Sequence, residues 1–216
     1  MVEIKSLAEA QQLKQSISDK SIVDETSFSF SGGDFTDIPL WIFELPHVES
    51  LRFTNTKITT VPNEIKKLGS TLAELDLARN EIKTLPDSIG QLTKMQKLDL
   101  RNNKLVQIPK SIGDCAALKT LVISNNLLKE LPSSLEKLQS IQSIDVQNCQ
   151  LLTLPYELKE CTSLSSLYLN KNNISTLPTC IPHLEFLSIL DLTNNKISES
   201  EKKAIKQILN VHDLRL

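Results

Sequence analysis

One line of sequence recurs along this chain at a fixed step of 23 residues. The stretch LDLARNEIKTLPDSIG, residues 75–90, returns as LDLRNNKLVQIPKSIG at 98–113. Looser copies begin at Leu121, Ile144, Leu167 and Leu190. Such self-similarity is typical of repeat proteins, in which each copy forms the same structural unit and contacts only its neighbours. We therefore expect an elongated stack of similar coils that together form one domain.

Two rows of residues set the register of eight copies, which we place at about 25–210. One row is mostly asparagine: Gly33, Thr56, Asn80, Asn103, Asn126, Cys149, Asn172 and Asn195. Only its step from Thr56 to Asn80 is 24 residues, with the extra residue near 69–71. The other row is Pro39, Pro62, Pro86, Pro109, Pro132, Pro155 and Pro178, and the eighth copy has Glu201 there.

Each part of the unit LxxLxLxxNxIxxLPxxIxxL has a physical explanation. The LxL segment has a period of two, which predicts a short strand with both leucines on one side. Asparagine suits the following tight turn, because its amide can bond backbone groups that the turn leaves unpaired, and stacked copies would form a ladder of such bonds. Proline fixes φ near −65° and removes a donor, which favours an extended or one-turn helical return segment.

A single coil of this kind cannot bury its apolar interior, so the copies must stack with strand beside strand. The strands then form a parallel sheet. Because the outer segments need more room than the strand spacing provides, the stack should bend with the sheet on its concave side. We predict an α/β solenoid, a curved horseshoe with short helical or extended segments on the convex face.

The stretches LPDSIGQL, IPKSIGDC and LPSSLEKL resemble leucine-rich repeats, in particular the 23-residue intracellular Ras-group type. That type includes Ras suppressor protein, the scribble and erbin family, plant intracellular Ras-group-related repeat proteins and the repeat arms of some bacterial effectors. The resemblance implies protein binding through the concave face, without catalysis. It also implies a small GTPase, or a signalling complex built on one, as the partner class.

The two ends are expected to close the stack. Residues 1–24 form an N-terminal cap, with Ile4, Leu7, Ala10, Leu13 and Ile17 at helical spacing over Glu3–Ile17. Five of the nine aromatic residues lie in the first 43 residues, where large rings can fill space that no earlier coil occupies. Residues 198–216 form a C-terminal cap, in which Ser198 and Glu201 make a capping box and an edge strand follows.

Composition narrows the classes of partner and compartment. The formal charge is −2, from 24 basic and 26 acidic residues, so nothing indicates a nucleic-acid partner. No apolar run is long enough to span a membrane, and the start MVEIKSLAEAQQLKQ lacks the apolar core of a signal peptide. We expect a cytoplasmic monomer, although secretion of an effector without a classical signal peptide stays open.

The cysteines are expected to be structural. Cys115 and Cys161 align with Leu92, Leu138 and Leu184 of other copies, which predicts buried positions. Cys149 occupies an asparagine position, and Cys180 aligns with Ser88, Ser111 and Ser134 and is expected to be the most exposed thiol. Their spacing matches no metal site, and no catalytic motif such as GxSxG, HExxH or Walker A is present. We predict no enzyme activity, metal or cofactor.

The candidate binding residues lie between the two strand leucines, where the side chain should face solvent on the concave side. Reading along the copies, this row is Ser29, Arg52, Asp76, Asp99, Val122, Asp145, Tyr168, Asp191 and Arg215. Ile189, from the row two positions earlier, should lie beside Tyr168. Apolar Val122 and Tyr168 have no structural reason to stand on the wet side of a strand. The aspartates could equally form a solubilising face.

We conclude from the sequence that the chain is a protein-interaction module or scaffold, with Arg52, Asp76, Asp99, Val122, Asp145, Tyr168, Ile189 and Asp191 as candidate partner-binding residues. Asn80, Asn103, Asn126, Cys149, Asn172 and Asn195 form the expected structural ladder. Two alternatives stay open. The chain could be the recognition arm of a bacterial effector or of a larger multidomain protein, or a purely structural scaffold that uses its convex face or its ends.

Overall fold

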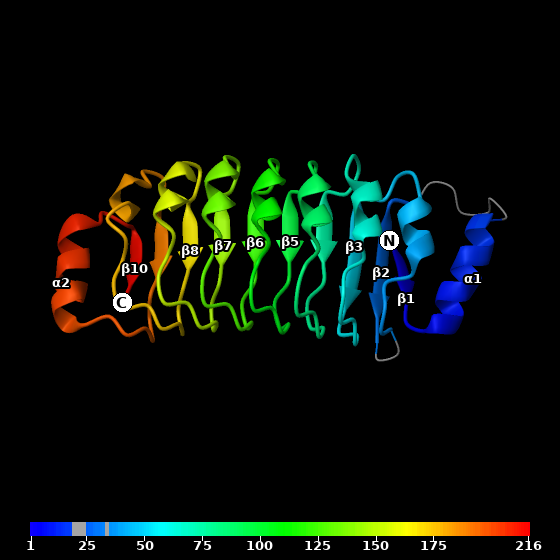
Figure 1. Ribbon diagram of the computed structural model, residues 1–216, viewed down its shortest axis with the longest axis horizontal. Helices are drawn as coiled ribbons and strands as arrows, with labels where there is room; N and C mark the ends of the chain where they lie inside the picture. Colours follow the sequence, from blue (N-terminus) through cyan, green and yellow to red (C-terminus); the bar gives the residue numbers. More distant parts are fainter. Residues whose placement is uncertain (19–24, 33–34) are drawn as a thin grey trace.

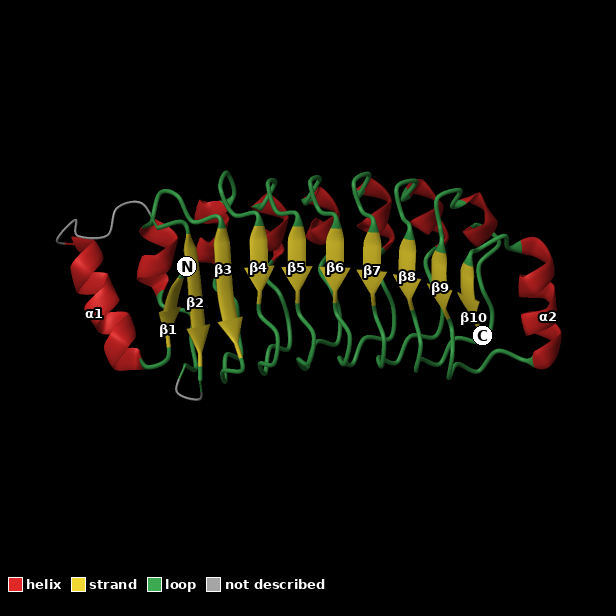
Figure 2. Cartoon of the chain, turned by 180° about the vertical axis from the view of Figure 1, so that it is seen from behind, coloured by secondary structure: helices red, strands yellow, loops and turns green. Residues whose placement is uncertain are grey.

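The structure is a computed structural model, and it describes residues 1–18, 25–32 and 35–216. Gly33, at the turn position of the first copy, and residues 19–24 of the expected N-terminal cap lie outside the described residues. In the described part the strands form one parallel sheet, and short 3-10 helices lie over one face of it (Figures 1 and 2).

The sheet has ten strands in the described residues, and their order in space follows their order in the chain. Each strand pairs in parallel with the next, in a register that places equivalent residues side by side, as with Leu75 and Leu98. The predicted leucine-rich repeat solenoid is confirmed. The strands are β1 (Val2–Ile4), β2 (Ser27–Ser31), β3 (Ser50–Thr54), β4 (Glu74–Asp76), β5 (Lys97–Asp99), β6 (Thr120–Val122), β7 (Ser143–Asp145), β8 (Ser166–Tyr168), β9 (Ile189–Asp191) and β10 (Asp213–Arg215).

The return segments are short 3-10 helices, and in the first six a proline is the N-cap residue. Pro86, for example, has φ −73° and ψ 153°, an extended conformation that its ring favours. The longer η2 is followed by the extra residue of the 24-residue step. These helices are η1 (Leu40–Glu44), η2 (Asn63–Leu68), η3 (Asp87–Gln91), η4 (Lys110–Asp114), η5 (Ser133–Lys137), η6 (Tyr156–Glu160) and η7 (Ile181–His183).

The apolar interior runs between the sheet and the return helices along the whole stack. From β4 to β9 the middle residue of each strand points into it, and these side chains, from Leu75 to Leu190, are fully buried. At the N-terminal end the interior is filled by aromatic rings, because Phe30 stacks on Phe53 with centroids 4.3 Å apart and meets Phe35 edge-on at 5.6 Å. One continuous core therefore joins all coils.

Side-chain amides connect consecutive coils at the turn after each strand. Asn126 Oδ1 accepts the backbone N–H of Leu105 in the preceding coil at 2.9 Å, and its Nδ2 donates to the carbonyls of Leu100 and Ile123 at 3.0 and 2.7 Å. Leu100 belongs to the preceding coil and Ile123 to the same one, so one amide satisfies three buried backbone groups. The same pattern is seen at Asn80, Asn103, Asn172 and Asn195.

Cys149 occupies the same position in the turn between those of Asn126 and Asn172 and makes weaker contacts. Its Sγ lies 3.6 Å from the carbonyl of Ile123 and 3.7 Å from that of Gln147. Burial raises the pKa of this thiol, against the hydrogen bonds from the Asn126 and Leu128 amides. Because a thiol is a weak donor and a weak acceptor, the two coils that meet here are less firmly connected than their neighbours.

We therefore expect Cys149→Asn to increase the free energy of unfolding by about 1 kcal/mol, because it completes the amide ladder at a site where five other copies already accommodate asparagine. Asn126→Ala should lower it by about 1 to 3 kcal/mol by leaving buried backbone groups unpaired. Urea unfolding measures both, with Cys149→Ala as the control. If Asn126→Ala lowers the free energy of unfolding no more than Asp145→Ala does, the amide ladder contributes little to stability.

The residue just before each ladder position has a left-handed backbone. Asparagine, the residue type that tolerates this conformation best after glycine, occupies it at Asn55, Asn102, Asn125, Asn148 and Asn194, with φ between 49° and 58°. Arg79 and Lys171 adopt the same conformation at φ 58°. The paired asparagines in the sequence were the signal for this row.

Lys171→Asn should consequently stabilise the fold by up to about 1 kcal/mol, since it replaces a lysine in the left-handed region with a residue suited to it. The thermal midpoint is the measurement, and Lys196→Asn, at an exposed turn position without positive φ, is the matched control for the loss of a charge. Equal midpoints for the two variants would mean that the turn carries no measurable strain.

The N-terminal segment differs from the expected helix over Glu3–Ile17. Residues Val2–Ile4 instead form β1, which pairs with Phe28–Phe30 of β2, and the helix α1 covers Leu7–Ser18. Ser6 Oγ accepts the amide of Glu9, and the Glu9 carboxylate accepts that of Lys5, a capping pattern visible as Ser-x-x-Glu in the sequence. The alternation Val-Glu-Ile favours the strand. Leu7, expected in the interior, is 55% exposed, whereas Ala10 and Leu13 are buried.

At the C-terminal end, α2 (Glu199–Ile208) follows the N-cap residue Ser198, whose side chain accepts the amide of Glu201 at 3.2 Å. Ile205 packs into the core, and β10 pairs with β9. The two helices lie at opposite ends of the stack (Figure 1). That they close it, as the predicted division into caps and eight repeats implies, stays a prediction.

All four cysteines are buried, which overturns one expectation. Cys180 was predicted to be the most exposed thiol because it aligns with serines, yet it is fully buried. The reason is that this position lies between adjacent return segments: Ser88 and Ser134 of the same row are themselves buried. Desolvation raises the pKa of the Cys115 and Cys161 thiols to about 12, so neither is a reactive nucleophile at neutral pH.

Candidate functional site

The face of the sheet that points away from the return helices is the predicted concave face, and strand pairing brings one residue from each of β3 to β10 into a continuous row on it. Pairing places Asp99 beside Val122, Val122 beside Asp145, Asp145 beside Tyr168, and Tyr168 beside Asp191. Arg52 and Asp76 extend the row toward the N-terminus, and Arg215 extends it at the other end. Ile189 pairs with Ser166, two residues before Tyr168.

The aspartates of this row have a structural task that sequence analysis missed. In each, one carboxylate oxygen accepts the backbone N–H two residues later, where the strand gives way to the turn. The acceptor-donor distances are 3.0 Å for Asp76 and Ala78, 3.1 Å for Asp99 and Arg101, 3.1 Å for Asp145 and Gln147, and 3.0 Å for Asp191 and Thr193. Aspartate followed by a turn is a known signal for this bond.

All the aspartates of this row were predicted to face solvent, but two of them are buried. Asp99 is 2% exposed and Asp191 is 8% exposed. Arg101 forms an ion pair with Asp99 at 2.9 Å, and Asp191 also accepts the Thr193 hydroxyl at 2.7 Å, with Arg215 3.7 Å away. Aspartates in equivalent positions therefore differ in exposure. The difference depends on whether the side chain two residues later, or one on the next strand, covers the carboxylate.

Asp145 is the available carboxylate in the C-terminal half of the row. It is half-buried, its Oδ1 accepts the Gln147 amide, and among the described residues it forms no ion pair. Its second oxygen is therefore free to meet a donor from a partner. Its neighbours Val122 and Tyr168 are also half-buried, as is Ile189. We call Val122, Asp145, Tyr168 and Ile189 the concave patch.

Three charged side chains in the N-terminal half of the face are paired with one another. Glu74 lies between two cations, with Arg52 at 3.0 Å and Lys97 at 2.9 Å. Burial alone would raise the pKa of the Glu74 carboxyl, but the hydrogen bonds and charges of Lys97 and Arg52 hold it below its ordinary value. Asp76 is the carboxylate of this half that forms no ion pair within the described residues: it is half-buried, and its Oδ1 accepts the Ala78 amide.

The described residues contain no group of three or more histidine, cysteine, aspartate or glutamate side chains arranged to hold a metal ion. Of the helices in the same residues, none combines the length and apolarity required to cross a bilayer. The concave face presents an aromatic ring, aliphatic groups and two carboxylates, those of Asp76 and Asp145, that form no ion pair within the described residues.

Asp99 makes a pH-dependent contribution to stability. Burial raises the pKa of its carboxyl above the ordinary 3.8, and nearby Asp76 acts in the same direction, while the Arg101 amide, Arg101 and Lys97 oppose them. A carboxyl with a raised pKa holds its proton more tightly in the folded state, so the free energy of unfolding falls as pH rises from the unfolded pKa to the folded one.

Asp99→Asn should remove that fall, because asparagine can still accept the Arg101 amide and carries no buried charge. The difference in unfolding free energy between Asp99→Asn and the wild type should therefore grow in favour of the variant as pH rises above 3.8. Urea unfolding at several pH values gives the comparison, with Asp145→Asn as the control. A difference that shrinks with rising pH would contradict the argument.

Solved structures of other repeat proteins resemble this one. A leucine-rich repeat protein of Leptospira interrogans is 27% identical and superposes with a TM-score of 0.67, covering 100% of this chain and 66% of its own. The ectodomain of the plant receptor kinase GASSHO1/SCHENGEN3 from Arabidopsis thaliana, in complex with CASPARIAN STRIP INTEGRITY FACTOR 2, is 25% identical, with a TM-score of 0.72 over 88% of this chain and 24% of its own.

A TDR receptor shares the fold at 21% identity, with a TM-score of 0.81 over 98% of this chain and 37% of its own. This chain thus spans at most about two thirds of the length of these proteins. A sequence search of curated proteins found no significant match. Leucine-rich repeat models match residues 46–105, 94–151 and 163–184, more than half of the sequence. With the stacked coils seen in the structure, these matches show that the chain belongs to the leucine-rich repeat family.

Proposed function

We propose that this protein binds another protein through the concave patch, and that the partner presents an arginine or lysine next to an apolar side chain. The leucine-rich repeat fold is commonly a protein-interaction module, and it is typically not enzymatic. The observation that carries the proposal is the position of Tyr168, an aromatic residue on the open face of the sheet, with the unpaired carboxylate of Asp145 on the adjacent strand.

The dimensions of the patch suit one partner element. Val122 and Tyr168 are two strands apart, about 10 Å at ordinary strand spacing, so one helix or loop can contact both. Aromatic anchors surrounded by less critical contacts are typical interface hot spots, and charge complementarity at the rim adds specificity and speed of association.

The partner class is a finer proposal. The 23-residue repeat and its LPxxIxxL segments resemble the intracellular Ras group, which favours a small GTPase or a signalling complex built on one, in the cytoplasm. A pull-down from native lysate, with and without a non-hydrolysable GTP analogue, tests this directly. Nucleotide-dependent capture of a GTPase that the Tyr168→Ala variant fails to retain would support it.

A second candidate is a recognition arm of a bacterial protein, which the 27% identity to the Leptospira interrogans protein favours. Under this alternative the concave patch would still be the contact surface, and only the partner would differ. Capture of a host protein without nucleotide dependence would favour it over the GTPase. A purely structural scaffold predicts instead that variants of the concave patch change no interaction.

Tyr168→Ala should weaken binding of the captured partner by about 2 kcal/mol and leave the fold intact, since the side chain lies outside the apolar core. Calorimetric or surface-based titration measures the loss. Tyr156→Ala is the matched control: the other tyrosine is 52% exposed, but it lies in η6 on the opposite face. Tyr168→Phe keeps the ring and removes the hydroxyl, so it distinguishes the contributions of these two groups to binding.

Asp145→Asn should slow association more than it speeds dissociation, and added salt should weaken the wild type more than this variant. The substitution keeps an acceptor for the Gln147 amide, so a change in rate reports the charge and not the turn. A partner that binds the Tyr168→Ala, Asp145→Asn double variant with unchanged affinity would place the contact surface elsewhere.

A further inference from the structure

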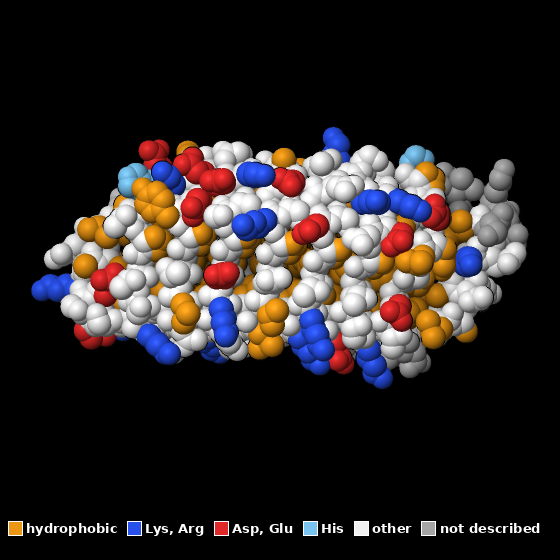
Figure 3. Space-filling model, in the orientation of Figure 1, with side chains coloured by type: hydrophobic (Ala, Val, Ile, Leu, Met, Phe, Trp, Pro, Cys, Tyr) orange, Lys and Arg blue, Asp and Glu red, His pale blue; other side chains and the backbone are white. Residues whose placement is uncertain are grey.

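The near-neutral composition conceals an uneven distribution of charge. We define the turn edge as residues 78–84, 101–107, 124–130 and 147–153, the turns that follow β4 to β7. These turns carry five basic residues, Arg79, Lys83, Arg101, Lys104 and Lys129, against the two acidic residues Glu81 and Glu130. Viewed from the return-helix side, lysine and arginine predominate along the lower margin of the molecule (Figure 3).

Apolar side chains interrupt this basic edge in a regular way. Three residues after each ladder position the sequence reads Lys83, Val106, Lys129 and Leu152. Val106 is 53% exposed and Leu152 is 57% exposed, so neither belongs to the core. Backbone hydrogen bonds join Val106 to Lys83 and Leu152 to Lys129, which fixes the residues as neighbours along one line. Basic and apolar groups thus alternate from coil to coil.

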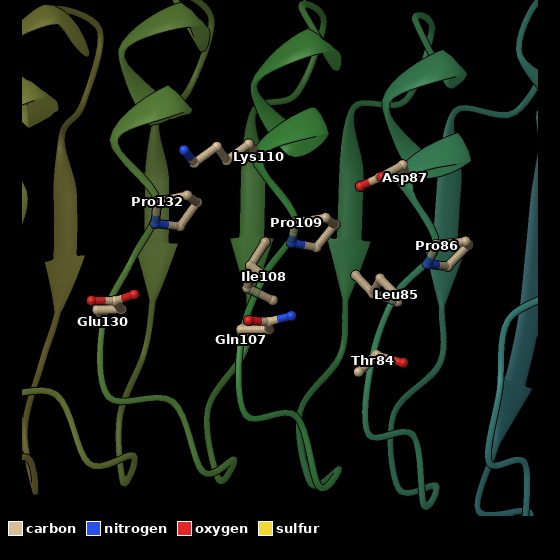
Figure 4. A pocket seen from close by; sticks show the side chains of 10 residues that line it. All are labelled: Thr84, Leu85, Pro86, Asp87, Gln107, Ile108, Pro109, Lys110, Glu130 and Pro132. Atoms are coloured by element: carbon tan, nitrogen blue, oxygen red, sulfur yellow. The ribbon is translucent and has the colours of Figure 1, made fainter.

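A groove of about 680 Å³ adjoins this line. The buried side chains of Leu85 and Ile108 line it, and Pro86, Pro109 and Pro132 stand at intervals along it (Figure 4). Asp87, Lys110 and Glu130 also line it. Its first residues, Thr84 and Gln107, come directly after Lys83 and Val106, so an occupant of the groove would also lie against the basic and apolar row.

Lys83 and Lys129 are the cations that a ligand can use. Lys104 is already paired with Glu81 at 2.8 Å, and Arg101 with Asp99. Lys83 and Lys129 are exposed and form no ion pair within the described residues. They are two coils apart, about 10 Å at ordinary strand spacing. A polyproline II segment has three residues per turn and rises about 3.1 Å per residue, so every third residue returns to the same side after about 9 Å.

We propose that the turn edge and its groove form a second binding surface, independent of the concave patch, for an extended acidic and apolar segment of a partner polypeptide. Acidic side chains at every third position meet Lys83 and Lys129. Apolar side chains on the next side of the segment contact Val106, Leu152 and the groove. The concavity favours a narrow chain over a flat anionic membrane, and the apolar residues distinguish the surface from one that merely collects anions.

The probe is a fluorescent peptide of about five Glu-Pro-Leu triplets, titrated against the full chain by anisotropy. Lys83→Glu with Lys129→Glu should weaken binding about tenfold. The control pair is Lys94→Glu with Lys119→Glu. These exposed lysines precede β5 and β6, whereas the turn edge follows the strands. The control changes the net charge equally and should have little effect on binding. Glu130→Lys should tighten binding about threefold, and Tyr168→Ala should not change it.

The apolar part has its own test. Val106→Ser with Leu152→Ser should weaken binding of the Glu-Pro-Leu peptide about fivefold and leave binding of a Glu-Pro-Ser peptide unchanged. Equal losses for the two lysine pairs, or equal binding of the leucine peptide by wild type and serine variant, would overturn the proposal. Binding to vesicles rich in anionic lipid, without binding to the peptide, would overturn it in favour of a membrane surface.

Discussion

The fold depends on hydrogen bonds that one coil cannot make for itself. The turn after each strand leaves buried backbone groups without partners, and the amide of a single asparagine satisfies groups in its own coil and in the preceding one. Asn126 shows this with bonds to Leu105, Leu100 and Ile123. Because an unpaired buried group costs about 1 to 3 kcal/mol, a coil is stable only beside its neighbours. The parallel sheet, the continuous core and the row of concave side chains all follow from that dependence.

The same dependence explains what the sequence could predict. A residue repeated every 23 positions occupies the same environment in every interior coil, so strand, ladder, proline turn and concave row were all readable from the pattern. The ends are less predictable because they have no neighbour on one side. Thus Val2–Ile4 became a strand by pairing with β2, where helical spacing had suggested the start of α1.

Surface residues depend on contacts outside the repeat pattern. Asp99 and Asp145 are equivalent in register, yet Arg101 covers the first and Gln147 leaves the second partly open. Cys180 was misjudged because its aligned serines are small and polar, although the position is packed between return segments. In both cases the neighbours in space decide exposure, and a single repeat does not contain them. The candidate binding residues could therefore be assigned to a row from the sequence, but the structure was needed to show which members of that row are exposed.

A solenoid can separate its surfaces in a way that a compact domain cannot. Each coil from β4 to β7 contributes one residue to the concave row and a separate turn to the turn edge, so a substitution in the first leaves the spacing of the second unchanged. The acidic and aromatic concave patch and the basic and apolar turn edge are consequently free to diverge on one shared interior. The concave patch is acidic and the turn edge is basic, so the two surfaces should select different segments. A basic segment that suits the concave patch is repelled by the turn edge, and an acidic segment that suits the turn edge is repelled by the concave patch. Two partners of different chemistry could then be held at a fixed distance by the same chain.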